Sequence, residues 1–214
     1  MANYEIEIKS LIGDKRKADE LVSKMKLADP GLVSVGKHKQ MNHYFVGGNL
    51  AKLKVRLNLE LPFQNPKDAS VRTRWADGRV ILVIKATVDD TTSSNGTARQ
   101  EFEKVMNLTL EQLDKALLDC GFEYQAKWSR EREEYQYKNM NVSIDKNAGY
   151  GYLVEFESVI TDLKMAEQTK TDIRDRMKEL AVEELPQDRL ERMFDYYNKH
   201  WQDYYGTEKV FNIA

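Results

Sequence analysis

Cysteine is almost absent from this chain of 214 residues, which contains only Cys120. A single cysteine excludes an intrachain disulfide framework and a cysteine-rich zinc site. The chain also lacks any run of 18 consecutive apolar residues, and its first residues, MANYEIEIK, have no apolar segment typical of a signal peptide. We therefore expect a cytoplasmic protein that does not insert into a membrane.

A strong excess of charge of either sign is missing as well. The 33 Lys and Arg residues nearly balance the 35 Asp and Glu residues, for a net charge of −2. This balance argues against nucleic acid or an anionic membrane as a partner bound through overall charge. The sequence has no GxxxxGK[ST] motif and hence no P-loop. Charged residues nevertheless make up 32% of the chain, so they must be spread over a large surface or gathered in a site.

Eight segments have the alternation or the β-rich composition of strands. They are residues 3–11, 40–46, 69–76, 79–87, 97–106, 128–138, 140–146 and 151–159. Turn signals predict hairpins at Ala76-Asp77-Gly78 and Lys138-Asn139, and a loop over 147–151. Helical periodicity predicts helices over 14–27, from a capping box at Thr109 to Cys120, over 162–184 and over 187–203. The insert 47–67 receives no assignment.

Charged side chains recur two residues apart on these strands, and such residues share one face of a sheet. Five strands carry pairs of equal sign: Glu5 and Glu7, Arg72 and Arg74, Glu101 and Glu103, Arg130 and Arg132, and Glu155 and Glu157. When a single strand has this pattern, the usual explanation is that its charged face contacts solvent and its apolar face covers the core. Like charges side by side repel, however, and an unconstrained surface intersperses the two signs. Lys85 also interrupts an otherwise apolar strand, where a solvated charge is least expected.

These faces could instead converge inside a closed antiparallel barrel. The interior would then hold six cations (Lys9, Arg72, Arg74, Lys85, Arg130 and Arg132) and seven acids (Glu5, Glu7, Glu101, Glu103, Asp145, Glu155 and Glu157). Burying unpaired charges is prohibitive, so such an interior must be hydrated and hold a ligand. Arg and Lys suit phosphate oxygens, and clustered carboxylates suit Mg²⁺ or Mn²⁺. The pattern indicates a site for a metal-bound, extended polyphosphate.

The stretch Glu5-Ile6-Glu7-Ile8-Lys9 resembles the ExExK signature of the CYTH superfamily, the triphosphate tunnel metalloenzymes. The motifs that follow are similar and come in the same order. They are Arg72-Thr73-Arg74, Ile84-Lys85, Glu101-Phe102-Glu103, Arg130-Glu131-Arg132, Asp145, and Gly151-Tyr152-Leu153-Val154-Glu155-Phe156-Glu157. The resemblance spans about residues 3–160. The superfamily includes class IV adenylyl cyclases, thiamine triphosphatases and inorganic tripolyphosphatases.

The resemblance implies an α+β fold, with an eight-stranded antiparallel tunnel at about 3–160 and helices at about 162–203. We expect one CYTH-like domain over residues 1–214. The six cations named above would bind the triphosphate and serve catalysis. Glu5, Glu7, Glu155, Glu157 and Asp145 would hold Mg²⁺ or Mn²⁺. Glu101 and Glu103 would be further ligands or lie in the shell around the ligands, or would only pair with the tunnel arginines. Asp145 could alternatively cap the following turn.

The sequence also departs from the superfamily. Vertebrate thiamine triphosphatases have a tryptophan two residues before the RxR motif, where this chain has Ser70. Trp75 falls on the opposite strand face from Arg72 and Arg74, which predicts a core position. His43, alone on its strand, is more consistent with a structural role. The apolar face of the helix at 187–203 would pack on the barrel or on a second subunit of a homodimer.

The sequence leaves three functions open. The first is metal-dependent hydrolysis of a nucleoside triphosphate or of inorganic tripolyphosphate, which needs only a phosphate clamp. The second is formation of cyclic AMP and pyrophosphate from ATP. The third is non-catalytic binding of a nucleotide or polyphosphate. The retained carboxylates favour an enzyme, and hydrolysis is the first hypothesis.

Overall fold

The structure is a computed structural model that describes residues 3–63, 69–87 and 98–213. The strands within these ranges are β1 (Tyr4–Gly13), β2 (Val33–Gly47), β3 (Ala69–Ala76), β4 (Arg79–Thr87), β5 (Ala98–Met106), β6 (Phe122–Tyr137), β7 (Met140–Asn147) and β8 (Gly151–Ile160). The helices are α1 (Lys15–Ala28), α2 (Leu50–Arg56), α3 (Leu110–Leu118), η1 (Leu163–Met165, a 3₁₀ turn), α4 (Ala166–Glu179) and α5 (Gln187–Tyr204). None of these described helices is both long and apolar enough to cross a membrane.

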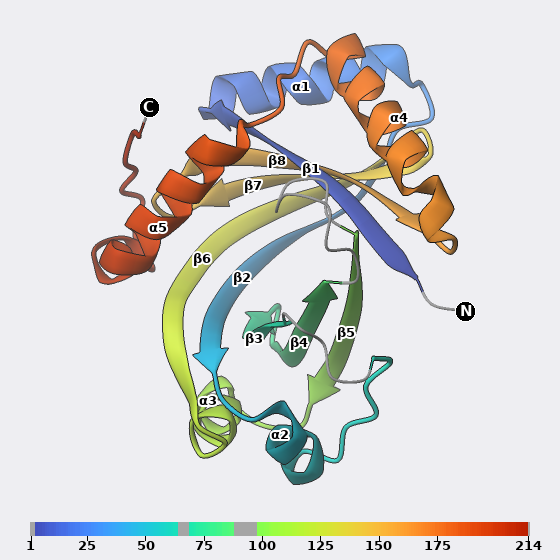
Figure 1. The fold of residues 1–214 in the computed structure, drawn as a ribbon. Helices are drawn as coiled ribbons and strands as arrows, with labels where there is room; N and C mark the ends of the chain where they lie inside the picture. The colour runs from blue at the N-terminus through green and yellow to red at the C-terminus, as the bar shows by residue number, and fades with distance from the viewer. Residues whose placement is uncertain (1–2, 64–68, 88–97, 214) are drawn as a thin grey trace.

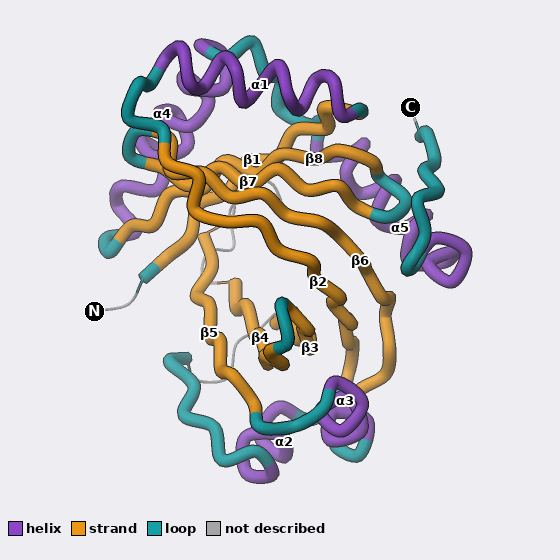
Figure 2. Tube along the Cα trace, turned by 180° about the vertical axis from the view of Figure 1, so that it is seen from behind, coloured by secondary structure: helices purple, strands orange, loops and turns teal. Residues whose placement is uncertain are grey.

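The described strands form a closed antiparallel barrel in the order β1-β5-β4-β3-β2-β6-β7-β8. Strand β1 closes the ring. It pairs with β8 along almost its whole length, but with β5 only at Glu5 and Ile6. The strands curve around a common interior, called the lumen below, with α1 and α4 on one side and α2 and α3 on the other (Figures 1 and 2). The predicted α+β fold with an eight-stranded antiparallel barrel is confirmed.

The predicted turns lie where the sequence placed them. Asp77 and Gly78 have φ of 48° and 81°, as a two-residue turn between β3 and β4 requires. Lys138, between β6 and β7, has φ of 52°. In the loop between β7 and β8, Gly149 has φ of 83°, and a Cβ there would lie 2.7 Å from the ring of Tyr197. Glycine at this position therefore lets α5 approach the barrel.

Two strands are longer than predicted. β2 begins at residue 33 instead of 40, and β6 begins at 122 instead of 128. Residues 33–39 have no buried side chain, so no burial alternation marks them as a strand. They are held by pairing with the far end of β6, a contact between residues about 100 positions apart. A register shift between Tyr44 and Phe45 interrupts the pairing of β2 with the start of β6.

The predicted helix at 162–184 is wrong at its C-terminal end. Helix α4 stops at Glu179, because Ala181 adopts a left-handed φ of 54° and Val182 donates its N–H to the Met177 carbonyl at 2.8 Å. Glycine usually occupies such a position, so no residue at 180–182 signals the end of the helix. The released chain then reaches the barrel, where the Leu185 N–H bonds to the Lys9 carbonyl at 2.8 Å.

The unassigned insert contains helix α2. Its N-cap is Asn49, whose side chain accepts a hydrogen bond from the Lys52 N–H at 2.9 Å. Leu53 of α2 is fully buried in the same apolar cluster as Leu113 and Leu117 of α3. Trp75, predicted as a core residue, is partly buried and packs against this cluster from the outer face of β3. Residues 64–67 of the insert lie outside the described residues.

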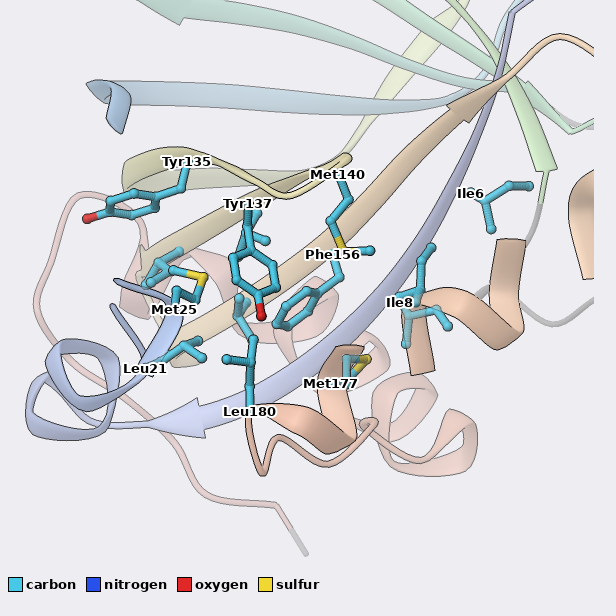
Figure 3. Packing of buried hydrophobic residues seen from close by; sticks show 14 of the residues in the cluster. Ile6, Ile8, Leu21, Met25, Tyr135, Tyr137, Met140, Phe156, Met177 and Leu180 are labelled. Carbon is cyan, nitrogen blue, oxygen red and sulfur yellow. The ribbon is translucent and has the colours of Figure 1, made fainter. Parts of the chain in front are cut away.

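The main cores lie outside the barrel wall, between the strands and the helices. In the first, Ile6 and Ile8 of β1 and Phe156 of β8 are fully buried against residues of α1 and α4 (Figure 3). The second lies under α2 and α3. Because strand residues alternate between faces, apolar outer positions leave the charged positions of the same strands facing the lumen.

A third apolar cluster lies against α5. Trp128 of β6 stacks on Tyr197 of α5 with ring centroids 3.6 Å apart, and Met193 is buried beside them. Trp128 shares its strand face with Arg130, so the inner face of β6 changes from charged to apolar toward α5. The apolar face of α5 therefore packs on the barrel, one of the two alternatives that its sequence left open.

Phe156→Ala is expected to lower the free energy of unfolding by about 3–5 kcal/mol, because it opens a cavity in the first core cluster. Urea denaturation of the purified variant would measure this loss. Val159→Thr, at a half-exposed position of the same strand, keeps the branched shape and should change stability by no more than about 0.5 kcal/mol. Equal effects at the two positions would contradict the assignment of Phe156 to the core.

Candidate functional site in the barrel lumen

The first and last strands of the barrel bring four predicted site residues side by side. Glu7 lies opposite Glu157, and Lys9 lies opposite Glu155, in the register of β1 with β8. The Lys9 Nζ donates to Glu7 Oε1 at 2.7 Å and lies 3.7 Å from Glu155 Oε1. The intervening Ile8 is fully buried on the outer side. The alternation of ExExK thus separates a charged inner face from an apolar outer face.

Ion pairs between strands that are not neighbours show that the other predicted charges also point inward. A side chain can reach past an intervening strand only on the concave face of the sheet. The pairs that do so are Lys85–Glu5 at 2.6 Å, Arg74–Glu103 at 2.8 Å, Arg72–Glu101 at 3.4 Å and Arg132–Glu155 at 2.5 Å. Lys85 also lies 3.1 Å from Glu101 on the adjacent strand.

Asp145 is fully buried beside two arginines of β6. Its carboxylate accepts from Arg132 Nε and Nη2 at 2.7 and 2.6 Å, and from Arg130 Nη1 at 2.9 Å. The two Arg132 bonds form the bidentate geometry that fixes the plane of a guanidinium. In this arrangement Asp145 orients Arg130 and Arg132, and its hydrogen bonds go to these side chains.

Arg99 is another cation of the lumen that was not among the predicted site residues. Arg99 Nη1 lies 3.6 Å from Glu7 Oε1. Arg99 precedes Glu101 and Glu103 on β5 by two and four residues, so it belongs to the same strand face. The period-2 rule that selected the two glutamates would also have found Arg99.

The inner face of β2 also contributes polar residues that were not predicted as part of the site. Gln40, Asn42 and Tyr44 alternate there, and each accepts a hydrogen bond from an arginine of the lumen. Their signal was weaker because none of them is charged at neutral pH. His43 lies on the outer face, with Nδ1 2.7 Å from the Asp114 carboxylate and Nε2 2.9 Å from the Tyr205 hydroxyl. This buried network agrees with the structural role predicted for His43.

Two carboxyl groups of the lumen share a proton. Burial and a hydrogen bond with Glu101 raise the pKa of Glu5 to about 8, although Lys85 opposes the shift. The pKa of Glu101 is lowered to about 2 against the effect of burial, through its hydrogen bond with Glu5 and the charges of Lys85 and Arg72. The pair therefore holds one proton to a higher pH than two separate carboxyl groups would.

The other lumen glutamates differ in how well cations neutralise them. Burial opposes ionisation of Glu7, but Lys9 and Lys85 lower its pKa to about 2. Arg132 and Lys9 likewise lower the pKa of Glu155 well below its usual range, in spite of burial. Burial raises the pKa of Glu157, with Lys85 opposing and Glu7 adding to the shift. Among the described residues Glu157 makes no ion pair, so its side of the lumen has a surplus of carboxylates.

The opposite side of the lumen has a surplus of cations. Burial and the charges of Arg72 and Arg130 lower the pKa of Arg74 to about 10, an effect that Glu103 only partly offsets. The Nε of Arg72 is buried and has no hydrogen-bond partner among the described residues. A buried N–H without an acceptor is costly, and here it lies among positive charges. An anion would satisfy both the N–H and the charge.

The surplus carboxylates have the chemistry of a Mg²⁺ or Mn²⁺ site. These ions take carboxylate oxygens, and a cation can replace the proton that Glu5 and Glu101 share. The residues present fit such an ion in the type of donor atom that they offer. In the described ranges, no three side chains of His, Cys, Asp or Glu are grouped so that they could hold a metal ion. Metal binding would require the glutamates of β1 and β8 to exchange ion-pair partners for the metal.

Comparisons with known proteins agree with this architecture. The family model of the CYTH domain matches residues 3–189. A candidate adenylate cyclase of Methanocaldococcus jannaschii is 25% identical over 178 residues, which are 83% of this chain and 90% of the relative.

Solved structures share the fold at lower sequence identity. A protein of Pyrococcus horikoshii superposes with a TM-score of 0.63 at 20% identity, over 88% of this chain and 99% of that one. A candidate adenylate cyclase of Vibrio parahaemolyticus gives a TM-score of 0.63 at 12% identity, over 91% and 99%. The family match covers most of the sequence, including every strand of the barrel. The chain therefore belongs to the CYTH domain family.

Proposed function

We propose that this protein is a metal-dependent enzyme that binds a triphosphate in the barrel lumen and hydrolyses it. The observation that carries the proposal is the convergence of the six predicted cations on one lumen. All six pair there with carboxylates of other strands: Lys9, Arg72, Arg74, Lys85, Arg130 and Arg132. Arg72, in addition, has a buried N–H without an acceptor.

The cations would bind and orient the phosphate chain. Phosphoryl transfer needs positioning and charge neutralisation more than covalent catalysis. Arg72, Arg74 and Arg130 would supply N–H donors on the cation-rich side, and Lys9 and Lys85 would supply point charges next to the glutamates. These fixed donors would stabilise the negative charge that develops on the leaving phosphate. Arg132, oriented by Asp145, would act in the same way.

The glutamates of β1 and β8 would hold the metal. Glu5, Glu7, Glu155 and Glu157 are the proposed ligands, while Glu101 and Glu103 pair with lysine and arginine side chains. When bound, Mg²⁺ or Mn²⁺ neutralises phosphate charge and lowers the pKa of a coordinated water. Asp145 was also predicted as a metal ligand. Its three bonds to Arg130 and Arg132 instead favour a role in orienting these arginines.

Cyclisation of ATP is the second candidate. The observation that favours it is the relative from Methanocaldococcus jannaschii, which is named as a candidate adenylate cyclase. The same cations would then present the α-phosphorus to the ribose 3′-hydroxyl, and pyrophosphate would leave. Hydrolysis remains the first candidate because it requires the phosphate clamp alone.

A substrate panel separates these reactions. The protein would be incubated with Mg²⁺ or Mn²⁺ and with ATP, inorganic tripolyphosphate or thiamine triphosphate. Release of phosphate is the expected result, whereas cyclic AMP with pyrophosphate would support the cyclase. Binding without any product would support a non-catalytic module and contradict the enzyme. Arg74→Ala should lose the activity, while Lys39→Ala, an exposed change on the outer face of β2, should keep it.

A further inference from the structure

Strand β2 places three neutral hydrogen-bond acceptors along the lumen, one for each of three arginines. Gln40 Oε1 accepts from Arg130 Nε at 2.8 Å. Asn42 Oδ1 accepts from Arg74 Nε at 3.0 Å. The third acceptor is the Tyr44 hydroxyl, which receives a hydrogen bond from Arg72 Nη1 at 2.8 Å. These arginines come from the two strands that flank β2 in the barrel, β6 and β3.

The neutrality of the three acceptors has a consequence for charge. Each of the three arginines already has a carboxylate partner in the lumen: Glu101 for Arg72, Glu103 for Arg74 and Asp145 for Arg130. The amide or hydroxyl oxygen from β2 orients the guanidinium without adding a further negative charge beside it. Each guanidinium has five N–H donors, so one bond to β2 and one to a carboxylate leave others for a ligand. The pKa of Tyr44 is lowered by Arg72, Arg130 and Arg74 against the effect of burial, which shows how positive this part of the lumen is.

The strand that carries the acceptors is itself fixed from outside. His43 and Thr73 face each other across β2 and β3, and both contact Asp114 of α3, at 2.7 and 2.5 Å. Tyr124 of β6 donates to the same carboxylate at 2.7 Å. One buried residue thus ties together the three strands that bear the acceptors and the arginines. The spacing between acceptor and arginine is therefore set by the barrel wall and not by mobile side chains alone.

We propose that Gln40, Asn42 and Tyr44 are positioning residues, which hold Arg130, Arg74 and Arg72 in the orientation that binds the phosphate chain. This inference rests on the proposed function, because it takes the ligand of these arginines to be a polyphosphate. The three residues act through the arginines, so their loss weakens phosphate binding only while the partner arginine is present.

Tyr44→Phe is the sharpest test, since it removes the hydroxyl that Arg72 binds and keeps the ring beside Trp128. The probe is inorganic tripolyphosphate, titrated calorimetrically with EDTA present so that metal-dependent turnover is prevented. Tyr44→Phe is expected to raise the Kd about tenfold, the effect of one charge-assisted hydrogen bond. Tyr135→Phe is the matched control, because its hydroxyl bonds to Glu133 on the outer side of β6, and its Kd should stay within about twofold of wild type.

A double-mutant cycle distinguishes positioning from a general structural effect. In an Arg72→Ala background, Tyr44→Phe is expected to change the Kd by less than about twofold. An undiminished loss in that background, or a wild-type Kd for the single variant, would overturn the positioning role and leave the proposed function intact. No tripolyphosphate binding by the wild type in EDTA would overturn the positioning role, because these arginines would then not bind the phosphate chain by themselves, whereas the substrate panel with metal tests the proposed function separately. If Tyr44→Phe fails to fold, Asn42→Leu with and without Arg74→Ala gives the same cycle at the next pair.

Discussion

Arg132→Ala is expected to lower kcat/KM for the triphosphate substrate by about 10²-fold or more. The Arg132 guanidinium is buried in the lumen, where Asp145 holds two of its nitrogens and Glu155 contacts one of them at 2.5 Å. A charge-assisted phosphate contact that strengthens in the transition state contributes about 3 kcal/mol, which corresponds to this factor. Steady-state kinetics over a range of substrate concentrations would measure the effect.

The neighbouring Glu131 supplies the control for this prediction. Its side chain is 55% exposed on the outer face and lies 3.4 Å from Lys39, an ion pair of the kind that contributes little to stability. Glu131→Gln should keep kcat/KM within about twofold. Thermal unfolding of Arg132→Ala must show a folded protein, because Asp145 then keeps only its bond to Arg130. Equal kinetic losses in both variants would contradict the inward orientation of Arg132. If neither variant loses activity, Arg130 and Arg132 have no role in catalysis and their strand face only contacts solvent.

The orientation of the charged residues could be predicted because strand alternation is a local rule. Once Ile6 and Ile8 are buried outside the barrel, Glu5 and Glu7 can only face the lumen. The same reasoning holds on β8, where Phe156 is in the core between Glu155 and Glu157. Because the charged motif residues all face the lumen, acidic and basic side chains of different strands come into contact there.

Apart from the strands joined by the predicted turns, the sequence could not predict which strands become neighbours. β1 pairs with β5 and β8, and β2 pairs with β6, so the barrel closes through contacts between distant segments. The start of β2 has no buried side chain and is a strand only because β6 lies beside it. Charge was also an incomplete guide to the site. Gln40, Asn42 and Tyr44 share the inner face with the motif residues, but their types alone do not distinguish them from structural polar residues.

The end of α4 shows a different limit. Sequence rules place helix ends at glycine or before proline, and Pro186 suggested that the helix continued to 184. The structure ends it at Glu179 with Ala181 in the left-handed region. Leu180 and Leu185 are buried there, and Leu185 bonds to the backbone of β1. These tertiary contacts compensate a conformation that alanine does not favour by itself.

Removal of divalent metal with EDTA is expected to abolish turnover, and added Mg²⁺ or Mn²⁺ is expected to restore it. The carboxylate surplus around Glu5, Glu101 and Glu157 motivates this result, because burial and neighbouring carboxylates raise the pKa of Glu5 and of Glu157, and a bound cation would relieve that repulsion. Lys39→Ala should show the same EDTA sensitivity as the wild type, since its exposed side chain lies outside the lumen. Full turnover in EDTA would contradict a metal-dependent enzyme.

Metal affinity should also depend on pH in a direction that the Glu5 pKa determines. A carboxylate must be ionised to bind a metal, and the pKa of Glu5 without metal is raised to about 8 by burial and by Glu101. Below that pH the metal must displace a proton, so its apparent Kd should fall as the pH rises from about 6 to 9. Activity at subsaturating Mg²⁺ should rise over the same range. Glu5→Gln cannot titrate, so it should bind Mg²⁺ more weakly and lose most of this pH dependence in calorimetric titrations. An unchanged pH dependence in that variant would exclude Glu5 as the group whose proton the metal replaces.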